Sequence, residues 1–224
     1  MRTLLIGMIL IFACNVHASY DSSWFQTEFW SGEWPHGYAV SKPNITVAAR
    51  TAMDRDLAPT IRCELPFKAV FSPWNDVRNS LSQVHYFTAS KIVNLVAKND
   101  FTFTDNNKSQ DIPIKKGQII EYLIYGAEGY FTIRINGEMH PAYQDLFDNV
   151  EDVNRDEFVQ EEWLQLNCVG GETAWIDTND LFTKDSHGDD VLIDGIWSAS
   201  IGGAGIDDYG HARDLTDDEV KNGH

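Results

Sequence analysis

Short runs of β-branched and aromatic residues, separated by residues typical of tight turns, set the strongest limit on what this chain can fold into. Phe101-Thr102-Phe103-Thr104 alternates as a half-buried strand does, and Gln118 to Tyr125 and Tyr130 to Ile135 are further strand-like runs. Asn136-Gly137, which follows, is the strongest two-residue hairpin signal, because both turn positions need a positive φ. No long run with the period of a helix stands out before the C-terminus. The chain is therefore predicted to be mainly β.

The first 18 residues have the pattern of an export signal. Arg2 is the only charge before the apolar run from Leu4 to Ala13, and Val16-His17-Ala18 has the A-x-A-like form that a signal peptidase reads. The run is shorter than the roughly 20 residues that a helix needs to cross a bilayer. Two alternatives remain: a buried N-terminal helix, and a lipoprotein signal in which Cys14 takes a lipid and tethers the chain to a membrane.

Cys63 and Cys168 are the two cysteines left once this signal is removed. Disulfides persist in oxidising compartments, so an exported chain is expected to join them in one bridge. Closing a loop of about a hundred residues stabilises a fold by on the order of 4–5 kcal/mol in the chain-entropy model. The alternative is a reactive thiol, with His85 or His140 as its base.

Charge and missing motifs limit the function. The formal net charge is −17, which disfavours nucleic acid and anionic membranes as partners. The sequence has no G-x-S-x-G, S-x-x-K, H-E-x-x-H or C-x-x-C box, so no catalytic residue, zinc site or cofactor is predicted. Asp177, Asn179, Asp180 and Asp185 carry ligands suited to Ca²⁺, but a solvated acidic surface is the simpler interpretation, so no metal is predicted.

Aromatic residues are the best candidates for ligand binding. Trp30, Trp34 and Tyr38 belong to a glycine-rich lead-in and can present flat faces to a sugar ring or a peptide. The alternative is that these side chains plug the core. Trp74 and Tyr130 complete the predicted set.

Motifs between residues 93 and 182 resemble those of a bacterial SH3-like domain. In that family a "kkG" turn precedes the middle strand, a tryptophan opens the penultimate strand, and a G-x-x-x-W-I/V hairpin closes the barrel. Ile114-Lys115-Lys116-Gly117, Trp163 and the segment Gly171 to Ile176 match these features. The chain departs from the pattern by a long insertion between Ile135 and Trp163, and it lacks the usual N-V-R-x-G-P opening.

The predicted fold is thus mainly β, with a small SH3-like antiparallel barrel and a β-rich N-terminal part packed against it. The signal covers residues 1–18, the N-terminal part 19–90, and the barrel 91–184 with an insertion near 140–162. An acidic C-terminal extension covers 185–224. The strand content of 19–90 permits a second barrel of the same kind, and the Cys63–Cys168 bridge is expected to link the two halves.

The expected function, as the resemblance implies, is an exported, non-catalytic binding module of the bacterial cell envelope. Its ligand would be cell-wall material or an envelope protein, and its location periplasmic or secreted, with no transmembrane segment in the mature chain. One alternative is an exported cell-wall hydrolase, an amidase or peptidase, that uses Cys63 or a His and acid site. The other is a secreted effector or inhibitor whose acidic extension engages a basic target.

Overall fold

The computed structural model describes residues 20–29, 31–32, 37–71, 84–152, 159–199, 213 and 216–222. Within these residues the chain is mainly β, which confirms the predicted fold class. The one α-helix described is α1 (Asp217–Asn222). No helix in the described part of the chain is long and apolar enough to cross a membrane. The predicted signal, residues 1–18, and the acidic residues of 200–212 lie outside the described ranges.

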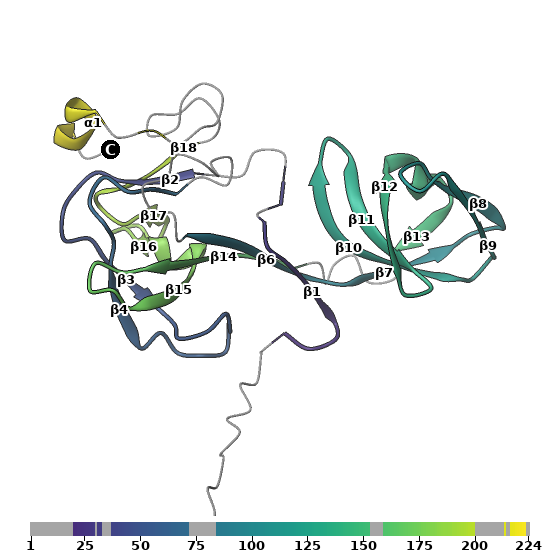
Figure 1. Ribbon diagram of the computed structural model, residues 1–224, viewed down its shortest axis with the longest axis horizontal. Helices are drawn as coiled ribbons and strands as arrows, with labels where there is room; N and C mark the ends of the chain where they lie inside the picture. The colour runs from purple at the N-terminus through teal and green to yellow at the C-terminus, as the bar shows by residue number, and fades with distance from the viewer. Residues whose placement is uncertain are drawn as a thin grey trace, which may run out of the picture.

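The strands gather into two lobes, each with its own core, and one lobe is inserted in the other. The inserted lobe consists of residues 92–152, drawn in teal in Figure 1. The outer lobe is built from residues 37–71 and 84–91 together with residues 159–199. Figure 1 shows the two lobes side by side, joined where β6 runs into β7.

The inserted lobe is a five-stranded antiparallel sheet with a hairpin at one side. Its strand order is β12-β11-β10-β7-β13, and β8 pairs with β9. Alternate residues of these strands point into one apolar core, as the sequence pattern predicts. The elements are β7 (Val93–Ala97), β8 (Phe101–Asp105), β9 (Gln110–Ile114), β10 (Ile119–Ala127), β11 (Tyr130–Ile135), β12 (Glu138–Tyr143), the 3-10 helix η1 (Gln144–Asp148) and β13 (Val150–Asp152).

The outer lobe contains two larger sheets and two hairpins. One sheet has the order β18-β2-β5 and the other β1-β6-β14-β15, while β3 pairs with β4 and β16 with β17. The elements are β1 (Trp24–Thr27), β2 (Gly37–Val40), β3 (Thr46–Ala49), β4 (Ile61–Glu64), β5 (Val70–Phe71), β6 (His85–Lys91), β14 (Gln160–Asn167), β15 (Thr173–Asp177), the 3-10 helix η3 (Thr178–Leu181), β16 (Phe182–Lys184), β17 (Asp190–Leu192) and β18 (Ile196–Ala199).

The two lobes repeat one order of elements. In the inserted lobe a first strand (β7) is followed by a hairpin, three antiparallel strands, a 3-10 helix and a last strand (β13) that pairs with the first. In the outer lobe β2 is followed by the hairpin β3–β4, then β5 and β6, β14, β15 and η3. An additional hairpin, β16–β17, comes next, and the last strand β18 pairs with β2. The inserted lobe occupies the connection between β6 and β14.

The predicted range 91–184 therefore joins parts of both lobes. The Ile114–Gly117 turn precedes β10 of the inserted lobe. Trp163 and the 171–176 hairpin lie on β14 and β15, which pair with each other and with β6 of the outer lobe. The stretch between Ile135 and Trp163, predicted to be an insertion, supplies β12, η1 and β13 of the inserted lobe. The reason is topological: a strand pairs with its partner in space, whatever separates the two in sequence.

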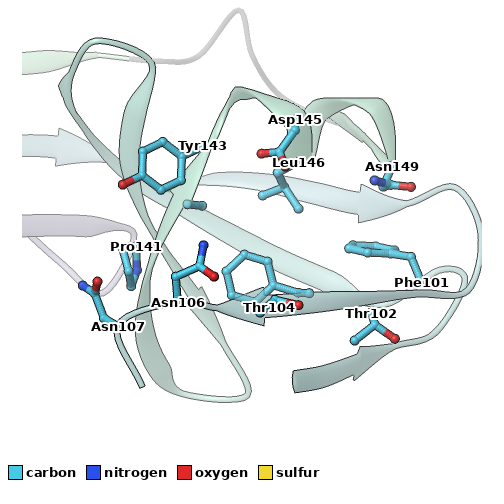
Figure 2. A pocket seen from close by; sticks show the side chains of 12 residues that line it. Phe101, Thr102, Thr104, Asn106, Asn107, Pro141, Tyr143, Asp145, Leu146 and Asn149 are labelled. Atoms are coloured by element: carbon cyan, nitrogen blue, oxygen red, sulfur yellow. The ribbon is translucent and has the colours of Figure 1, made fainter. Parts of the chain in front are cut away.

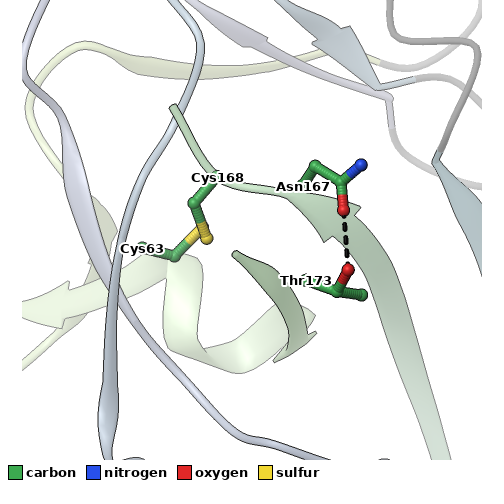
Figure 3. The surroundings of a disulfide bond; sticks show 4 residues. All are labelled: Cys63, Asn167, Cys168 and Thr173. Carbon is green, nitrogen blue, oxygen red and sulfur yellow. Dashed lines mark hydrogen bonds between the residues drawn. A yellow bond between two sulfur atoms is a disulfide. The ribbon is translucent and has the colours of Figure 1, made fainter. Parts of the chain in front are cut away.

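Cys63 and Cys168 form a disulfide, as predicted (Figure 3). Their Cα atoms lie 5.2 Å apart, and both residues are buried in the core of the outer lobe. Cys63 lies on β4 and Cys168 directly follows β14, so the bridge joins the part of the outer lobe that precedes the inserted lobe to the part that follows it. It closes the outer lobe and does not tie that lobe to the inserted one.

Candidate binding groove

A groove with a volume of about 190 Å³ runs across the inserted lobe between the β8–β9 hairpin and the end of β12. Figure 2 shows its two walls, with Thr102 and Thr104 on the strand that faces Tyr143 and Asp145. One wall and its turn supply residues 101–104, Asn106 and Asn107. The other supplies Pro141, Ala142, Tyr143, Asp145, Leu146 and Asn149.

The floor of the groove is apolar and its rim is polar. Phe103, Ala142 and Leu146 are buried members of the core of the inserted lobe, so they fix the depth of the groove. The exposed side chains of Thr102, Thr104, Asn106 and Asn107 surround this floor with hydrogen-bond donors and acceptors. An apolar base with a few convergent polar groups is the usual form of a binding site for a small molecule or a short segment of chain.

Tyr143 connects this groove to a second, more open hollow of about 330 Å³. The second hollow is lined by Glu128, Gly129, Tyr143, Gln144 and Asp145, so the two hollows share Tyr143 and Asp145. The side chain of Tyr143 is 53 % exposed. Its ring is held at one edge by Tyr130, whose centroid lies 5.7 Å away in an edge-to-face contact.

The hairpin wall is fixed from beneath by a buried hydrogen bond between an aspartate and a histidine. Asp105, the last residue of β8, has its Oδ2 atom 2.8 Å from Nδ1 of His140 on β12, and both side chains are buried. The other carboxylate oxygen of Asp105 accepts hydrogen bonds from the backbone N–H groups of Asn107 and Lys108, at 2.9 and 3.1 Å. This pair thereby links the 105–108 turn to β12. The hydrogen bond with His140 holds the pKa of Asp105 below its usual value.

The electrostatic character of the groove disfavours anions. Among the described residues that line either hollow, none has a basic side chain, whereas Glu128 and Asp145 are acidic. Asp145 is exposed and lies in the first turn of η1. The site therefore suits a ligand that is neutral or positively charged where it meets Asp145.

Arg50 lies at the corresponding position in the outer lobe. Arg50 directly follows β3, as Asp105 ends β8, and it is also buried. Its guanidinium donates to the backbone oxygen of Leu57 at 2.9 Å and to the carboxylate of Asp180 in η3. Its backbone pairs with that of Trp175 on β15. These contacts tie the β3–β4 hairpin directly onto β15 and η3, where the inserted lobe leaves a groove.

Comparison with models of protein families, with curated proteins and with solved structures finds no match to this chain.

Of the residues that the sequence predicts for ligand binding, the two that the structure describes, Tyr38 and Tyr130, do not line the groove. Tyr38, on β2, is only 6 % exposed and belongs to the core of the outer lobe, where burial raises its pKa to about 12. Tyr130 is half-buried, and its ring packs edge to face against the ring of Tyr143. Trp30, Trp34 and Trp74 lie outside the described residues.

Most residues of the groove carried no signal of a site in the sequence. The sequence predicts Phe101 to Thr104 as a half-buried strand and nothing more. Nothing in the sequence singled out Tyr143 or Asp145, because a lone tyrosine and a lone aspartate after a strand are common on surfaces.

The acidic residues considered as Ca²⁺ ligands have other partners. Asp177 accepts a hydrogen bond from the backbone N–H of Asn179 at 2.9 Å, and Asp180 pairs with Arg50. The Asp185 carboxylate accepts backbone N–H bonds of its own turn. In the described part of the chain, no three His, Cys, Asp or Glu side chains converge in a way that could hold a metal ion.

Proposed function

We propose that this chain is an exported, non-catalytic binding module of the bacterial cell envelope, and that the groove of the inserted lobe is its ligand site. The observation that carries the proposal is the exposed Tyr143 ring above an apolar floor, with amide and hydroxyl groups around it. Aromatic faces and neutral hydrogen-bonding groups suit sugar rings and peptides, the two components of cell-wall material, and they equally suit a segment of an envelope protein.

Two further observations support the proposal. The Cys63–Cys168 disulfide is what an oxidising compartment favours. The Ile114–Gly117 turn ahead of β10 is one of the motifs that resemble SH3-like domains, which are binding domains. The rival hydrolase that uses Cys63 as its nucleophile loses that group, because a sulfur in a disulfide is not a thiolate.

The proposal is tested by binding of the mature protein to purified peptidoglycan and to an envelope extract. Tyr143→Ala removes the exposed ring of the groove and should weaken retention by about tenfold or more, since exposed aromatic anchors often dominate such contacts. Phe67→Ala is the matched control, because Phe67 is an exposed aromatic residue of the outer lobe at 44 % exposure and lies far from the groove in sequence and lobe.

The expected result is loss of retention for Tyr143→Ala and unchanged retention for Phe67→Ala. Equal binding by the unsubstituted protein and Tyr143→Ala would rule out the groove as the ligand site. Absence of binding to either material by the unsubstituted protein would remove the support for an envelope-binding function.

A further inference from the structure

The N-terminal segment, defined here as residues 20–29, 31 and 32, runs along the outer lobe. Its strand β1 pairs with β6 over four residues, from Trp24 opposite Lys91 to Thr27 opposite Thr88. At one end the hydroxyl of Tyr20 accepts a hydrogen bond from Nε1 of the buried Trp163 at 2.8 Å. The hydroxyl of Thr88, also buried, donates to the backbone oxygen of Phe29 at 2.7 Å. The segment is therefore held firmly by the outer lobe.

The far end of this segment reaches the inserted lobe. The backbone N–H of Gly32 donates to the backbone oxygen of Gly126 at 2.9 Å. Gly126 lies at an irregularity of the β10–β11 pair: Tyr125 faces Phe131 and Ala127 faces Tyr130, so Gly126 has no partner residue on β11. A residue left over at such a bulge has backbone groups that the ladder does not use, and here Gly32 supplies the partner.

Gly126 is in turn packed against the aromatic residues of the groove. A Cβ atom at position 126 would lie 2.3 Å from Cδ1 of Tyr130, so the ring of Tyr130 rests directly on this glycine. The same ring supports Tyr143, which borders both hollows. A continuous chain of contacts therefore runs from Gly32 through Gly126 and Tyr130 to Tyr143.

We propose that the N-terminal segment positions the Tyr143 wall of the groove from outside the inserted lobe, through Gly126 and Tyr130. The proposal rests on the proposed function in that it takes the groove as the ligand site. The opposite wall is held from within the lobe by Asp105 and His140. The 105–108 turn is attached to β12 by a contact within the inserted lobe that the N-terminal segment does not touch, so loosening this segment should leave residues 105–109 in place.

Hydrogen exchange of backbone amides in the full chain tests this without any ligand. Gly32→Ala is the first variant, because Gly32 has φ of +121°, which an L-residue rarely adopts, while an added Cβ meets no atom within 4 Å. The substitution should displace the Gly32 N–H from Gly126. Exchange over residues 126–130 should rise by about three- to tenfold, the effect of one lost hydrogen bond, and exchange over 105–109 should not change.

Three further variants keep the test decisive. Thr88→Val removes the bond to Phe29, leaves Gly32 itself intact and should raise exchange over the same residues. Asp105→Asn should raise exchange over residues 105–109 and leave exchange over residues 126–130 unchanged. Ser41→Ala is the matched control, since it removes a buried hydroxyl-to-carbonyl bond to Gly195 within the outer lobe, and it should change neither wall.

Unchanged exchange over 126–130 in both Gly32→Ala and Thr88→Val would overturn the proposal. An equal rise at both walls would also overturn it, because that result indicates general loosening of the inserted lobe. Failure of the groove to bind any envelope material would leave the exchange result unaffected, so the two proposals fail separately.

Discussion

Glu162 is a residue whose ionisation opposes folding. It lies on β14 opposite Thr88 of β6, and its side chain is largely withdrawn from water. Burial is the main cause that raises its pKa to about 7; a hydrogen bond with Gln160 acts in the other direction, and the nearby charge of Asp177 adds to the rise. The folded protein therefore prefers Glu162 protonated, whereas a carboxyl in the unfolded chain titrates near pH 4.3.

The sign of the pH effect follows from these two values. A carboxyl whose pKa is raised by folding stabilises the folded state only where it is protonated there, so its contribution is lost as pH rises from about 4 to 7. Glu162→Gln keeps the shape without the charge. At pH 8 we expect it to raise the free energy of unfolding by roughly 1–3 kcal/mol, and at pH 5 by much less.

Urea denaturation at the two pH values measures this difference. Glu172→Gln is the control, because Glu172 is an exposed glutamate in the turn after β14 and its neutralisation should have little effect at either pH. A stabilisation by Glu162→Gln that is the same at pH 5 and pH 8 would contradict the argument.

The β11–β12 hairpin is the element in which sequence and structure agree most closely. Asn136 and Gly137 have φ of 52° and 88°, both in the left-handed region, as the Asn-Gly signal predicts. The two strands that they connect pair without a break in register, from Tyr130 opposite Tyr143 to Ile135 opposite Glu138. This local signal is reliable because the turn and its two strands are neighbours along the chain.

Gly137→Ala should destabilise the protein by about 1 kcal/mol, since alanine pays the steric cost of a positive φ at this position. The added methyl group itself meets no atom within 4 Å, so the backbone conformation is the sole reason for the loss. Gly170→Ala provides the control: Gly170 is also an exposed turn glycine with open space around it, but it does not have a positive φ.

Thermal unfolding of the two variants makes the comparison. The expected outcome is a lower midpoint for Gly137→Ala and a midpoint for Gly170→Ala at or above that of the unsubstituted protein. Equal midpoints for the two variants would show that the sign of φ at residue 137 has no energetic consequence.

At the scale of the whole molecule, the disulfide and the insertion are linked. Cys63 and Cys168 are 105 residues apart, and the inserted lobe lies between them. The outer lobe is built from two segments that come from opposite sides of the inserted lobe, and the bridge is a covalent link between those segments. In the chain-entropy model a loop of this length contributes about 4.7 kcal/mol.

Replacement of both cysteines by alanine should therefore lower the stability of the outer lobe by about 3–5 kcal/mol. All seven tryptophans lie outside residues 92–152, so tryptophan fluorescence reports on the chain outside the inserted lobe. Amide signals of residues 92–152 in NMR spectra report on the inserted lobe. In the double variant we expect the fluorescence transition to occur at a lower urea concentration than the loss of the amide signals of residues 92–152.

The matched condition is the unsubstituted protein with its disulfide reduced, which should give the same fluorescence midpoint as the double variant. An unchanged midpoint in both cases would mean that the bridge adds no stability. Loss of the amide signals of the inserted lobe at the same urea concentration as the fluorescence change would instead identify one cooperative unit.

The insertion also explains why the motifs quoted between residues 93 and 182 come from both lobes. Both lobes follow the same order of elements, and the inserted lobe starts where the outer lobe has completed its first half. From residue 93 onward the chain therefore contains first the strands of the inserted lobe and then the last strands of the outer lobe. The kkG turn and the Trp163 strand fit one pattern, although they belong to different lobes.

The features that could be predicted from the residues are local: the β class, the Asn136-Gly137 turn and the alternation of Phe101 to Thr104. The Cys63–Cys168 pair is predicted because these two cysteines are left once the predicted signal, with Cys14, is removed. The tertiary structure alone decided which strands share a core, that Tyr38 is buried, and that Tyr143 and Asp145 meet the β8 strand at a groove. The reason is physical: strand propensity and turn chemistry act between neighbours in sequence, whereas pairing and burial act between neighbours in space.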